Sequence, residues 1–221
     1  MSAACFMDDR DGWTGLHRTL AVMPNQFPIS PLAVLMFPTE HRAELEPEDL
    51  TSALDFAKCF PEYLIFHNML GSGASRPEHV HLQGVLRHEP YAIERAPRTV
   101  LFSTAGTEVA RLDGYPVYSL AVRGARTVEI AFALMSDVQP NPFNLVLTRG
   151  ETIVIPRSKD RPAGFDGAFA GLEMAGGIVL TDDEQYAHLT ASDIRRALSD
   201  CGIGHAEQRA LEYRLRYRFV C

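Results

Sequence analysis

The chain has 221 residues and a formal net charge of -7, from 21 basic and 28 acidic side chains. Hydrophobic residues make up 46% of it and charged residues 22%, which is typical of a globular protein and excludes a disordered chain. The acidic balance argues against a nucleic-acid backbone as the main partner, because that partner needs a basic surface. A small anion held by a few local arginines is still compatible with it.

No apolar run approaches the roughly 20 residues that a membrane-spanning helix needs. Residues 1–13 contain an acidic cluster and no apolar segment of the kind found in signal peptides. The 4 cysteines form no CxxC pair, so neither a zinc ribbon nor a disulfide framework is indicated. We therefore expect a cytoplasmic protein that does not interact with a membrane.

The first part of the chain predicts four strands and one helix. Apolar runs indicate strands over residues 16–23 and 32–37, separated by a proline-rich turn. Apolar side chains recur at helical spacing over residues 47–60. A buried strand is expected over residues 63–67, and an alternating strand over residues 79–86.

The middle of the chain has weaker patterns. Short strands and turns are expected over residues 89–114, followed by a strand over 115–122. The pattern over residues 125–135 is compatible with a helix or a strand, and a helix is favoured. Two apolar runs, over residues 143–148 and 152–155, flank a turn that contains glycine. This pattern predicts a β-hairpin.

Two further elements are expected near the C-terminus. Residues 192–201 are predicted to form an amphipathic helix that ends at Gly202. Aromatic or aliphatic residues alternate with arginines over residues 213–219, which predicts a strand with one arginine face. Residues 36–42 and 154–161 both contain a strand end, a proline and a polar stretch closing with arginine. This similarity hints at two related α+β halves.

The segment from residue 66 to residue 83 carries the most chemical information. Residues 71–75 are all small, so the backbone N–H groups there can approach an anion closely, and Arg76 adds a forked cation. His79, His81 and Gln83 follow at alternate positions and would project from one face of a strand. A neutral imidazole is a competent nucleophile near pH 7, so the combination is suited to attack on phosphorus.

Each part of this combination alone has a simpler interpretation. A small-residue loop is more often a turn than a phosphate cradle, and a lone His-x-His is as typical of a metal site or of chance as of a nucleophile. No spacing singles out a further metal ligand among the nearby candidates His41, His67, Glu78 and His88. The joint pattern therefore favours phosphate chemistry.

Asn68, the run Gly73-Ala74-Ser75 and the run from His79 to Gln83 together resemble the signature of the histidine-triad (HIT) superfamily. The order His-x-His-x-Gln is similar to the branch of galactose-1-phosphate uridylyltransferases, diadenosine-tetraphosphate (Ap4A) phosphorylases and GDP-galactose phosphorylases. The resemblance implies an α+β, HIT-like fold with a mainly antiparallel sheet flanked by helices. It also implies a single domain made of two fused related halves, at about residues 14–123 and 124–221.

The same resemblance implies roles for individual residues. His81 would be the nucleophile that forms a nucleotidyl-histidine, Gln83 would bind the phosphoryl oxygens, and His79 would support the site. The residues expected to bind the substrate are Asn25, Phe27, Asn68, Gly73, Ala74 and Ser75. Three arginines in polar stretches are expected to neutralise its phosphates, because site residues tend to collect on loops: Arg76, Arg157 and Arg161. No metal or cofactor is expected.

The sequence thus predicts a nucleotidyltransferase or phosphorylase. Its partners would be a small nucleotide, such as a nucleoside polyphosphate or a sugar nucleotide, and a phosphate acceptor. Two alternatives stay open, namely hydrolysis of a nucleotide conjugate and nucleotide binding without turnover. The resemblance is also compatible with either a monomer or a homodimer.

Overall fold

The computed structural model describes residues 5–8, 12–76, 78–180 and 182–220. Its strands are β1 (Cys5–Asp8), β2 (Gly12–His17), β3 (Leu20–Pro24), β4 (Val34–Pro38), β5 (Tyr63–Asn68), β6 (Leu82–Leu86), β7 (Arg98–Thr104), β8 (Thr107–Leu112), β9 (Leu120–Gly124), β10 (Phe143–Thr148) and β11 (Glu151–Pro156). Its helices are α1 (Pro47–Cys59), α2 (Ala92–Arg95), α3 (Thr127–Val138), α4 (Gly171–Met174), α5 (Asp183–His188), α6 (Ala191–Cys201) and α7 (His205–Phe219).

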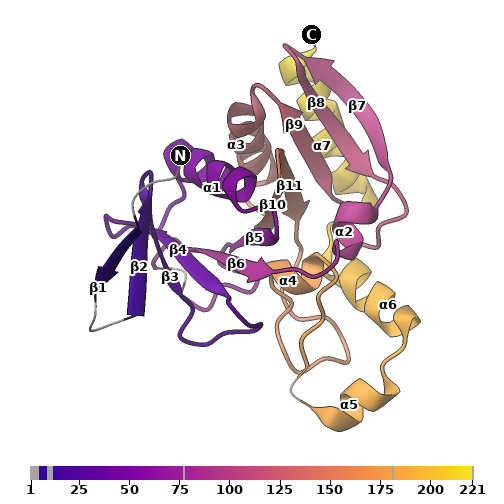
Figure 1. Cartoon of the computed structure of the whole chain (residues 1–221). Helices are drawn as coiled ribbons and strands as arrows, with labels where there is room; N and C mark the ends of the chain where they lie inside the picture. The colour runs from indigo at the N-terminus through magenta and orange to yellow at the C-terminus, as the bar shows by residue number, and fades with distance from the viewer. Residues whose placement is uncertain (1–4, 9–11, 77, 181, 221) are drawn as a thin grey trace.

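Within these described residues, all the strands belong to one sheet in the order β1-β2-β3-β4-β6-β5-β10-β11-β9-β8-β7 (Figure 1). Neighbouring strands run antiparallel, as in the pairings of β5 with β6 and of β5 with β10. The fold class is therefore confirmed as α+β, with a large antiparallel sheet flanked by helices. No helix in the described part of the chain is both long and apolar enough to cross a membrane.

Helices cover both faces of the sheet. On one face α1, α3 and α7 share a buried cluster with the strands, which includes Leu50, Leu134 and Leu215. On the other face α2, α4 and α6 pack on a second cluster around Phe66 and Val146. Successive residues of the central strands belong alternately to the two clusters. This alternation is expected for a sheet that is buried on both faces.

The predicted helix over residues 47–60 is confirmed as α1. Pro47 occupies its first turn, and the backbone N–H of Glu46 donates to Asp49 (2.9 Å). The guanidinium of Arg42 also binds this buried carboxylate through two nitrogens, at 3.0 and 2.8 Å. Since the carbonyl of Arg42 accepts from Val80 N–H (2.8 Å), the start of α1 is connected to the segment that carries the histidines.

The strand order contains the same topology twice. The elements β3, β4, α1, β5 and β6 form the order β3-β4-β6-β5, and the elements β8, β9, α3, β10 and β11 form the order β8-β9-β11-β10. The two stretches, residues 20–86 and 107–156, meet where β5 pairs with β10. Two fused related halves are therefore present in the topology.

The details of this duplication differ from the prediction. The expected boundary near residues 123–124 falls between β9 and α3, inside the second stretch. The similar segments 36–42 and 154–161 contain the ends of β4 and β11, which are not equivalent in the two topologies. The local similarity of a strand end followed by proline therefore does not mark the true repeat.

Two of the predicted strands are wrong. Residues 16–23 contain the end of β2, a turn at residues 18–19 and most of β3, so the apolar run is a hairpin. Residues 213–219 belong to α7, in which Leu211 and Leu215 are buried four positions apart while Tyr213 and Tyr217 are exposed. The prediction was misled by the alternation over residues 213–219. The first buried residue of the helical face, Leu211, lies before this window, so the helical spacing was not visible within it.

Candidate active site

The residues around the His-x-His-x-Gln motif lie at one edge of the sheet. There β6 begins beside the end of β5, and β10 begins on the other side of β5. In this register His67 lies opposite Leu82, and Asn68 lies opposite Asn144. Residues 69–81 form the loop that connects the two strands across this edge, and we call it the β5–β6 loop.

Ser72 anchors the base of the β5–β6 loop. Its side chain is fully buried, its hydroxyl oxygen lies 2.6 Å from the carbonyl oxygen of Phe143, and it accepts from Met69 N–H at 2.8 Å. The loop is therefore attached to the first residue of β10. This serine was not among the expected site residues, although it lies in the small-residue run.

Glycine is required at Gly73 for two reasons. Its φ is +90°, and a Cβ atom there would lie 2.8 Å from Cα of Ala170. The loop thus packs directly on the segment that enters α4. Within the described residues, the backbone N–H groups of Gly73, Ala74 and Ser75 donate to no protein acceptor. With the exposed side chains of Ser75 and Arg76, they form a set of free donors, as a phosphate cradle requires.

The two motif histidines lie just before β6, and only Gln83 belongs to the strand, so the expected strand start at residue 79 is wrong. His81 Nδ1 lies 2.9 Å from the carbonyl oxygen of His79. A carbonyl can only accept, so Nδ1 carries the proton and Nε2 keeps its lone pair. This contact gives His81 the tautomer that a nucleophile needs.

His67 supports the same segment from the neighbouring strand. Its Nδ1 lies 2.9 Å from the carbonyl oxygen of His81 and therefore donates to it. Burial lowers the pKa of His67 to about 4, so the ring is neutral at pH 7. Both carbonyls that flank Val80 are thus held by imidazoles.

The ring of His79 packs against two aromatic rings, that of Phe37 in β4 and that of His41 after the end of this strand. Ring centroids are 4.6 Å apart for His79 and His41, and 5.8 Å apart for His79 and Phe37. Burial, with the nearby rings of His41 and His81, lowers the pKa of His79 below its ordinary value. His79 is therefore well placed to support the site in neutral form.

Gln83 shares a sheet face with residues next to α4. It lies opposite Leu35 on β4 and opposite Phe66 on β5, and Phe66 belongs to the buried cluster under α4. Directly opposed residues point to the same face. Gln83 is partly exposed, so its amide can reach a ligand on this face.

A buried network of amides joins the two topological halves. Asn144 Nδ2 lies 2.9 Å from Oδ1 of Asn68 and 2.8 Å from the carbonyl oxygen of Ser72. Arg157 donates to Oδ1 of Asn144, and Gly171 N–H donates to Oδ1 of Asn68 at 2.8 Å. Asn68 thus lies at the base of the β5–β6 loop, and Asn144, which the sequence analysis did not single out, contacts both.

The structure corrects the expected role of Arg157. Its side chain has an exposed fraction of 0%, and its donors also bind the carbonyl oxygens of Cys201 (3.3 Å) and Lys159 (2.9 Å). A guanidinium enclosed in this way does not reach a substrate phosphate. Arg161 is exposed, and its recorded contact is with the carbonyl of Asp166 in its own loop (3.5 Å).

Asn25 and Phe27 lie in the turn between β3 and β4. Oδ1 of Asn25 accepts from Phe27 N–H (3.0 Å), which leaves the ring of Phe27 83% exposed. This turn lies before Val34, the first residue of β4, whereas His79 contacts Phe37 near the other end of the same strand. At about 3.3 Å per residue, roughly 10 Å of β4 separates the turn from the contact with His79.

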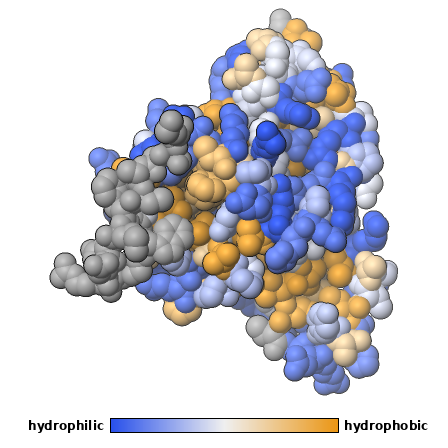
Figure 2. All heavy atoms as spheres, in the orientation of Figure 1, coloured by the Kyte–Doolittle hydropathy of each residue, from blue (hydrophilic) through white to orange (hydrophobic). Residues whose placement is uncertain are grey.

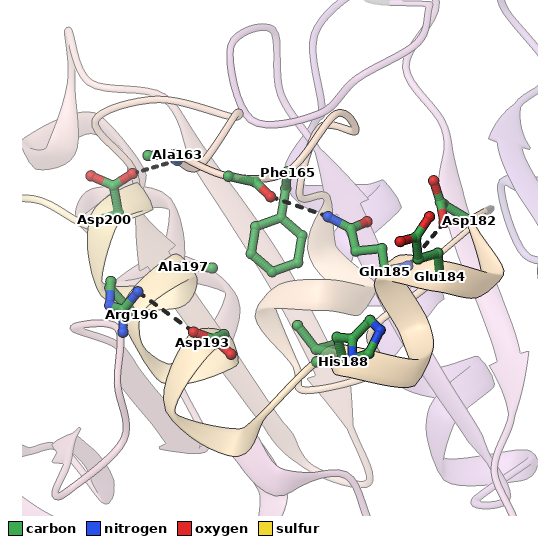
Figure 3. A pocket seen from close by; sticks show the side chains of 12 residues that line it. Ala163, Phe165, Asp182, Glu184, Gln185, His188, Asp193, Arg196, Ala197 and Asp200 are labelled. Carbon is green, nitrogen blue, oxygen red and sulfur yellow. Dashed lines mark hydrogen bonds and ion pairs between the residues drawn. The ribbon is translucent and has the colours of Figure 1, made fainter.

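The described cavities lie away from His81. One of about 570 Å³ lies between residues 163–165, α5 and α6, with the ring of Phe165 pointing into it (Figure 3). Another of about 320 Å³ lies between α2 and α6, in the partly apolar area that Figure 2 shows there. None of the expected site residues lines either one. Among the described residues, no three His, Cys, Asp or Glu side chains group closely enough to hold a metal ion.

Two family models match the sequence. A domain of unknown function (DUF4922) matches residues 12–86, and the ATP adenylyltransferase C-terminal domain matches residues 95–204. The division between them falls after β6, in agreement with the two topological stretches. A search of the curated proteins gave no match.

The fold is similar to that of yeast Ap4A phosphorylase Apa2. Its complex with AMP superposes with a TM-score of 0.67 at 20% identity, over 84% of this chain and 73% of that chain. Its complex with Ap4A gives a TM-score of 0.66 at 21% identity, over 84% and 74%. The chain therefore has the HIT-like fold of this phosphorylase. An ADP-glucose phosphorylase from Arabidopsis thaliana is more distant, with a TM-score of 0.40 at 9% identity over 91% of this chain and 88% of that one.

Besides Ser72, three residues with contacts at this site lay outside the expected set. Asn144 follows Phe143 at the start of a strand, and only the pairing of β5 with β10 brings it to Asn68. His41 follows the proline that ends β4, and His67 precedes Asn68 in a buried strand. A polar side chain within or just beyond an apolar strand was the one signal available for all three.

Proposed function

We propose that this protein transfers a nucleotidyl group, with His81 as the nucleophile. The observation that carries the proposal is the contact of His81 Nδ1 with the carbonyl oxygen of His79 (2.9 Å). It leaves Nε2 with a free lone pair in the same loop in which the backbone N–H groups of residues 73–75 have no protein acceptor within the described residues. The fold shared with a phosphorylase of Ap4A supports this chemistry.

The reaction has two displacement steps at one phosphorus. The lone pair of His81 Nε2 forms a bond to the α-phosphorus, and the bond from that phosphorus to the bridging oxygen breaks. The leaving phosphate, or sugar phosphate, departs with the electron pair. An oxygen of an acceptor phosphate then attacks the same phosphorus, and the nitrogen–phosphorus bond breaks to restore neutral His81.

The substrate would be a nucleoside polyphosphate such as Ap4A, or a sugar nucleotide. Its phosphates would receive hydrogen bonds from the backbone of residues 73–75 and from Ser75, Arg76 and Gln83, while the exposed ring of Phe27 is available to stack on a base. Such preorganised donors stabilise charge that develops on the phosphoryl oxygens.

Gln83 would favour a phosphate acceptor over water. A primary amide donates a hydrogen bond to a phosphoryl oxygen but does not take up a proton at neutral pH. Water needs a base to attack, whereas an ionised phosphate needs none. We therefore propose phosphorolysis or transfer rather than hydrolysis.

Trapping of the covalent intermediate tests the proposal. The protein is incubated with labelled Ap4A, ATP or a sugar nucleotide in phosphate-free buffer, and the adduct is mapped by mass spectrometry. We expect an acid-labile, base-stable nucleotidyl adduct on His81, which added phosphate discharges. His81→Ala should abolish it, whereas His205→Ala, at an exposed histidine in α7, should leave it intact. An adduct on His79, or one that persists in His81→Ala, would contradict the proposal.

A further inference from the structure

We infer that Asn144 and Arg157 are positioning residues that turn the amide of Asn68 so that its NH2 group faces the substrate phosphate. The inference rests on the proposed function, since it assigns a donor to the same site. It starts from the orientation of two buried amides, which their hydrogen-bond partners determine.

The orientation of Asn144 follows from three neighbours. Nδ2 lies 2.9 Å from Oδ1 of Asn68 and 2.8 Å from the carbonyl oxygen of Ser72, and both of these atoms can only accept. On its other side, Asn144 accepts from the guanidinium of Arg157, which can only donate. A flipped amide would place a donor against a donor and an acceptor against two acceptors. Asn144 therefore has one satisfied orientation.

The orientation of Asn68 then follows from Asn144. Oδ1 of Asn68 accepts from Asn144 Nδ2 and from Gly171 N–H (2.8 Å), which uses both of its lone pairs. Nδ2 must point the other way. Within the described residues it donates to no protein acceptor, and it is not among the fully enclosed unsatisfied atoms. Since Asn68 directly precedes the β5–β6 loop, this free donor lies at the base of the proposed phosphate cradle.

Arg157 holds the amide of Asn144 in its orientation. Its remaining donors bind the carbonyl oxygens of Cys201 and Lys159, so the guanidinium cannot turn away from Asn144 without breaking these contacts. The second topological half thus sets the direction of a donor in the first half. This arrangement explains a buried arginine close to a phosphate site without any contact between the two.

A nuclear magnetic resonance experiment on the side-chain amides tests this orientation without using activity. In the wild-type protein, the hydrogens of Asn144 Nδ2 should exchange slowly, because both are donated inside the protein. The Asn68 Nδ2 signals should exchange faster and should shift when inorganic phosphate is added. Asn68 signals that are protected and unmoved by phosphate, while the Gly73–Ser75 amides shift, would overturn the inference.

The isosteric variant Asn144→Asp tests the consequence for catalysis. A carboxylate at this position replaces the donor to Oδ1 of Asn68 by an acceptor, so it opposes the orientation of the Asn68 amide that Gly171 N–H also holds. We expect kcat/KM for Ap4A to fall roughly 10- to 150-fold, the loss of a hydrogen bond to a charged group. Asn141→Asp, a matched change at a side chain bound to Glu207, should leave kcat/KM within about twofold.

A double-mutant cycle separates positioning from a structural role. If Asn144 acts through Asn68, then Asn144→Ala should cost no further kcat/KM in an Asn68→Ala background, although each change lowers the melting temperature separately. Additive losses in kcat/KM would contradict the proposal that Asn144 acts through Asn68. Failure of the His81 adduct alone would contradict the proposed function but not the amide orientation seen by magnetic resonance.

Discussion

At the scale of single residues, contacts with backbone carbonyls determine the tautomers of two histidines of the candidate site, His81 and His67. The carbonyl of His79 sets the tautomer of His81, and the carbonyl of His81 sets that of His67. The amides of Asn68 and Asn144 are oriented by their contact with each other and by backbone atoms of Gly171 and Ser72. The chemistry of the site therefore depends on side chains whose hydrogen-bond partners leave them one satisfied orientation.

Burial of His67 predicts a loss of stability in acid. Its pKa is about 4 in the folded protein and about 6.5 in the unfolded chain, so between these values the unfolded chain binds a proton that the folded state rejects. Stability should fall as the pH drops below 6.5, by roughly 3 kcal/mol near pH 4. Urea unfolding of wild type and His67→Asn at pH 7 and pH 4 should show this extra loss in the wild type only. Identical pH dependence in both proteins would refute the assignment.

The arginines should divide between binding and stability. Arg76 is exposed in the β5–β6 loop, and Arg76→Ala should raise KM roughly 10- to 150-fold without changing the melting temperature. Arg157→Ala leaves several carbonyl acceptors unpaired in the interior and should lower the free energy of unfolding by about 3 kcal/mol. Arg161→Ala, at the other exposed position, is the comparison for Arg76. An unchanged KM in both Arg76→Ala and Arg161→Ala would place the phosphate contacts elsewhere.

At the scale of elements, the β5–β6 loop is held by packing against the start of α4. This contact needs a residue without a side chain at Gly73, where a Cβ would collide with Ala170. It also keeps Gly171 N–H within 2.8 Å of Asn68. The shape of the loop and the donor at its base are therefore linked.

Gly73→Ala should consequently be more damaging than an ordinary substitution at positive φ. Backbone strain alone costs about 1 kcal/mol, and the contact with Ala170 adds a shift of the backbone. Gly114 has a φ of +67° with nothing within 4 Å of its Cβ position, so Gly114→Ala carries the strain alone. Urea unfolding should show the larger loss for Gly73→Ala, and the His81 adduct should fall in that variant only. Equal losses of unfolding free energy in both variants would indicate that the backbone at Ala170 moves away from the new Cβ at no measurable cost.

Local patterns predicted some of these elements and failed for others. Helix α1 and the hairpin of β10 and β11 were predictable, because a capped amphipathic repeat and two apolar runs around a glycine turn are short-range signals. Helix α7 was not, since Leu211 and Leu215 define its buried face only together with the strands it covers. The His-x-His-x-Gln motif identified the first half of the site. The contact of Asn144 with Asn68 depends on strand pairing across 76 positions, which no local pattern contains.

At the scale of the whole molecule, two stretches of the same topology differ most in one connection. A long loop joins β5 to β6, whereas the equivalent strands β10 and β11 are joined by a tight turn at Arg149 and Gly150. A turn of this length has no room for a phosphate cradle. Instead, Asn144 in the second stretch contacts Asn68 in the first, and Arg157, directly after the second stretch, binds Asn144.

This asymmetry predicts one active site per chain. Quantitative mass spectrometry of the intact protein, after reaction without an acceptor, should show at most one nucleotidyl group on each chain. A second nucleotidyl group would mean that the later half carries its own nucleophile. It would contradict the prediction that only the β5–β6 loop, and not the β10–β11 turn, forms a phosphate cradle. His188→Ala and His205→Ala, in the later part of the chain, should not change this stoichiometry.

The stereochemical course at phosphorus tests the central claim most directly. A nucleotide substrate carrying an α-thiophosphate of one configuration is converted in the presence of an acceptor phosphate, and the configuration of the product is determined. Transfer through His81 requires two in-line displacements, each of which inverts the phosphorus, so the account predicts net retention. Net inversion would mean that the acceptor attacks the substrate directly, and would contradict a covalent intermediate on His81.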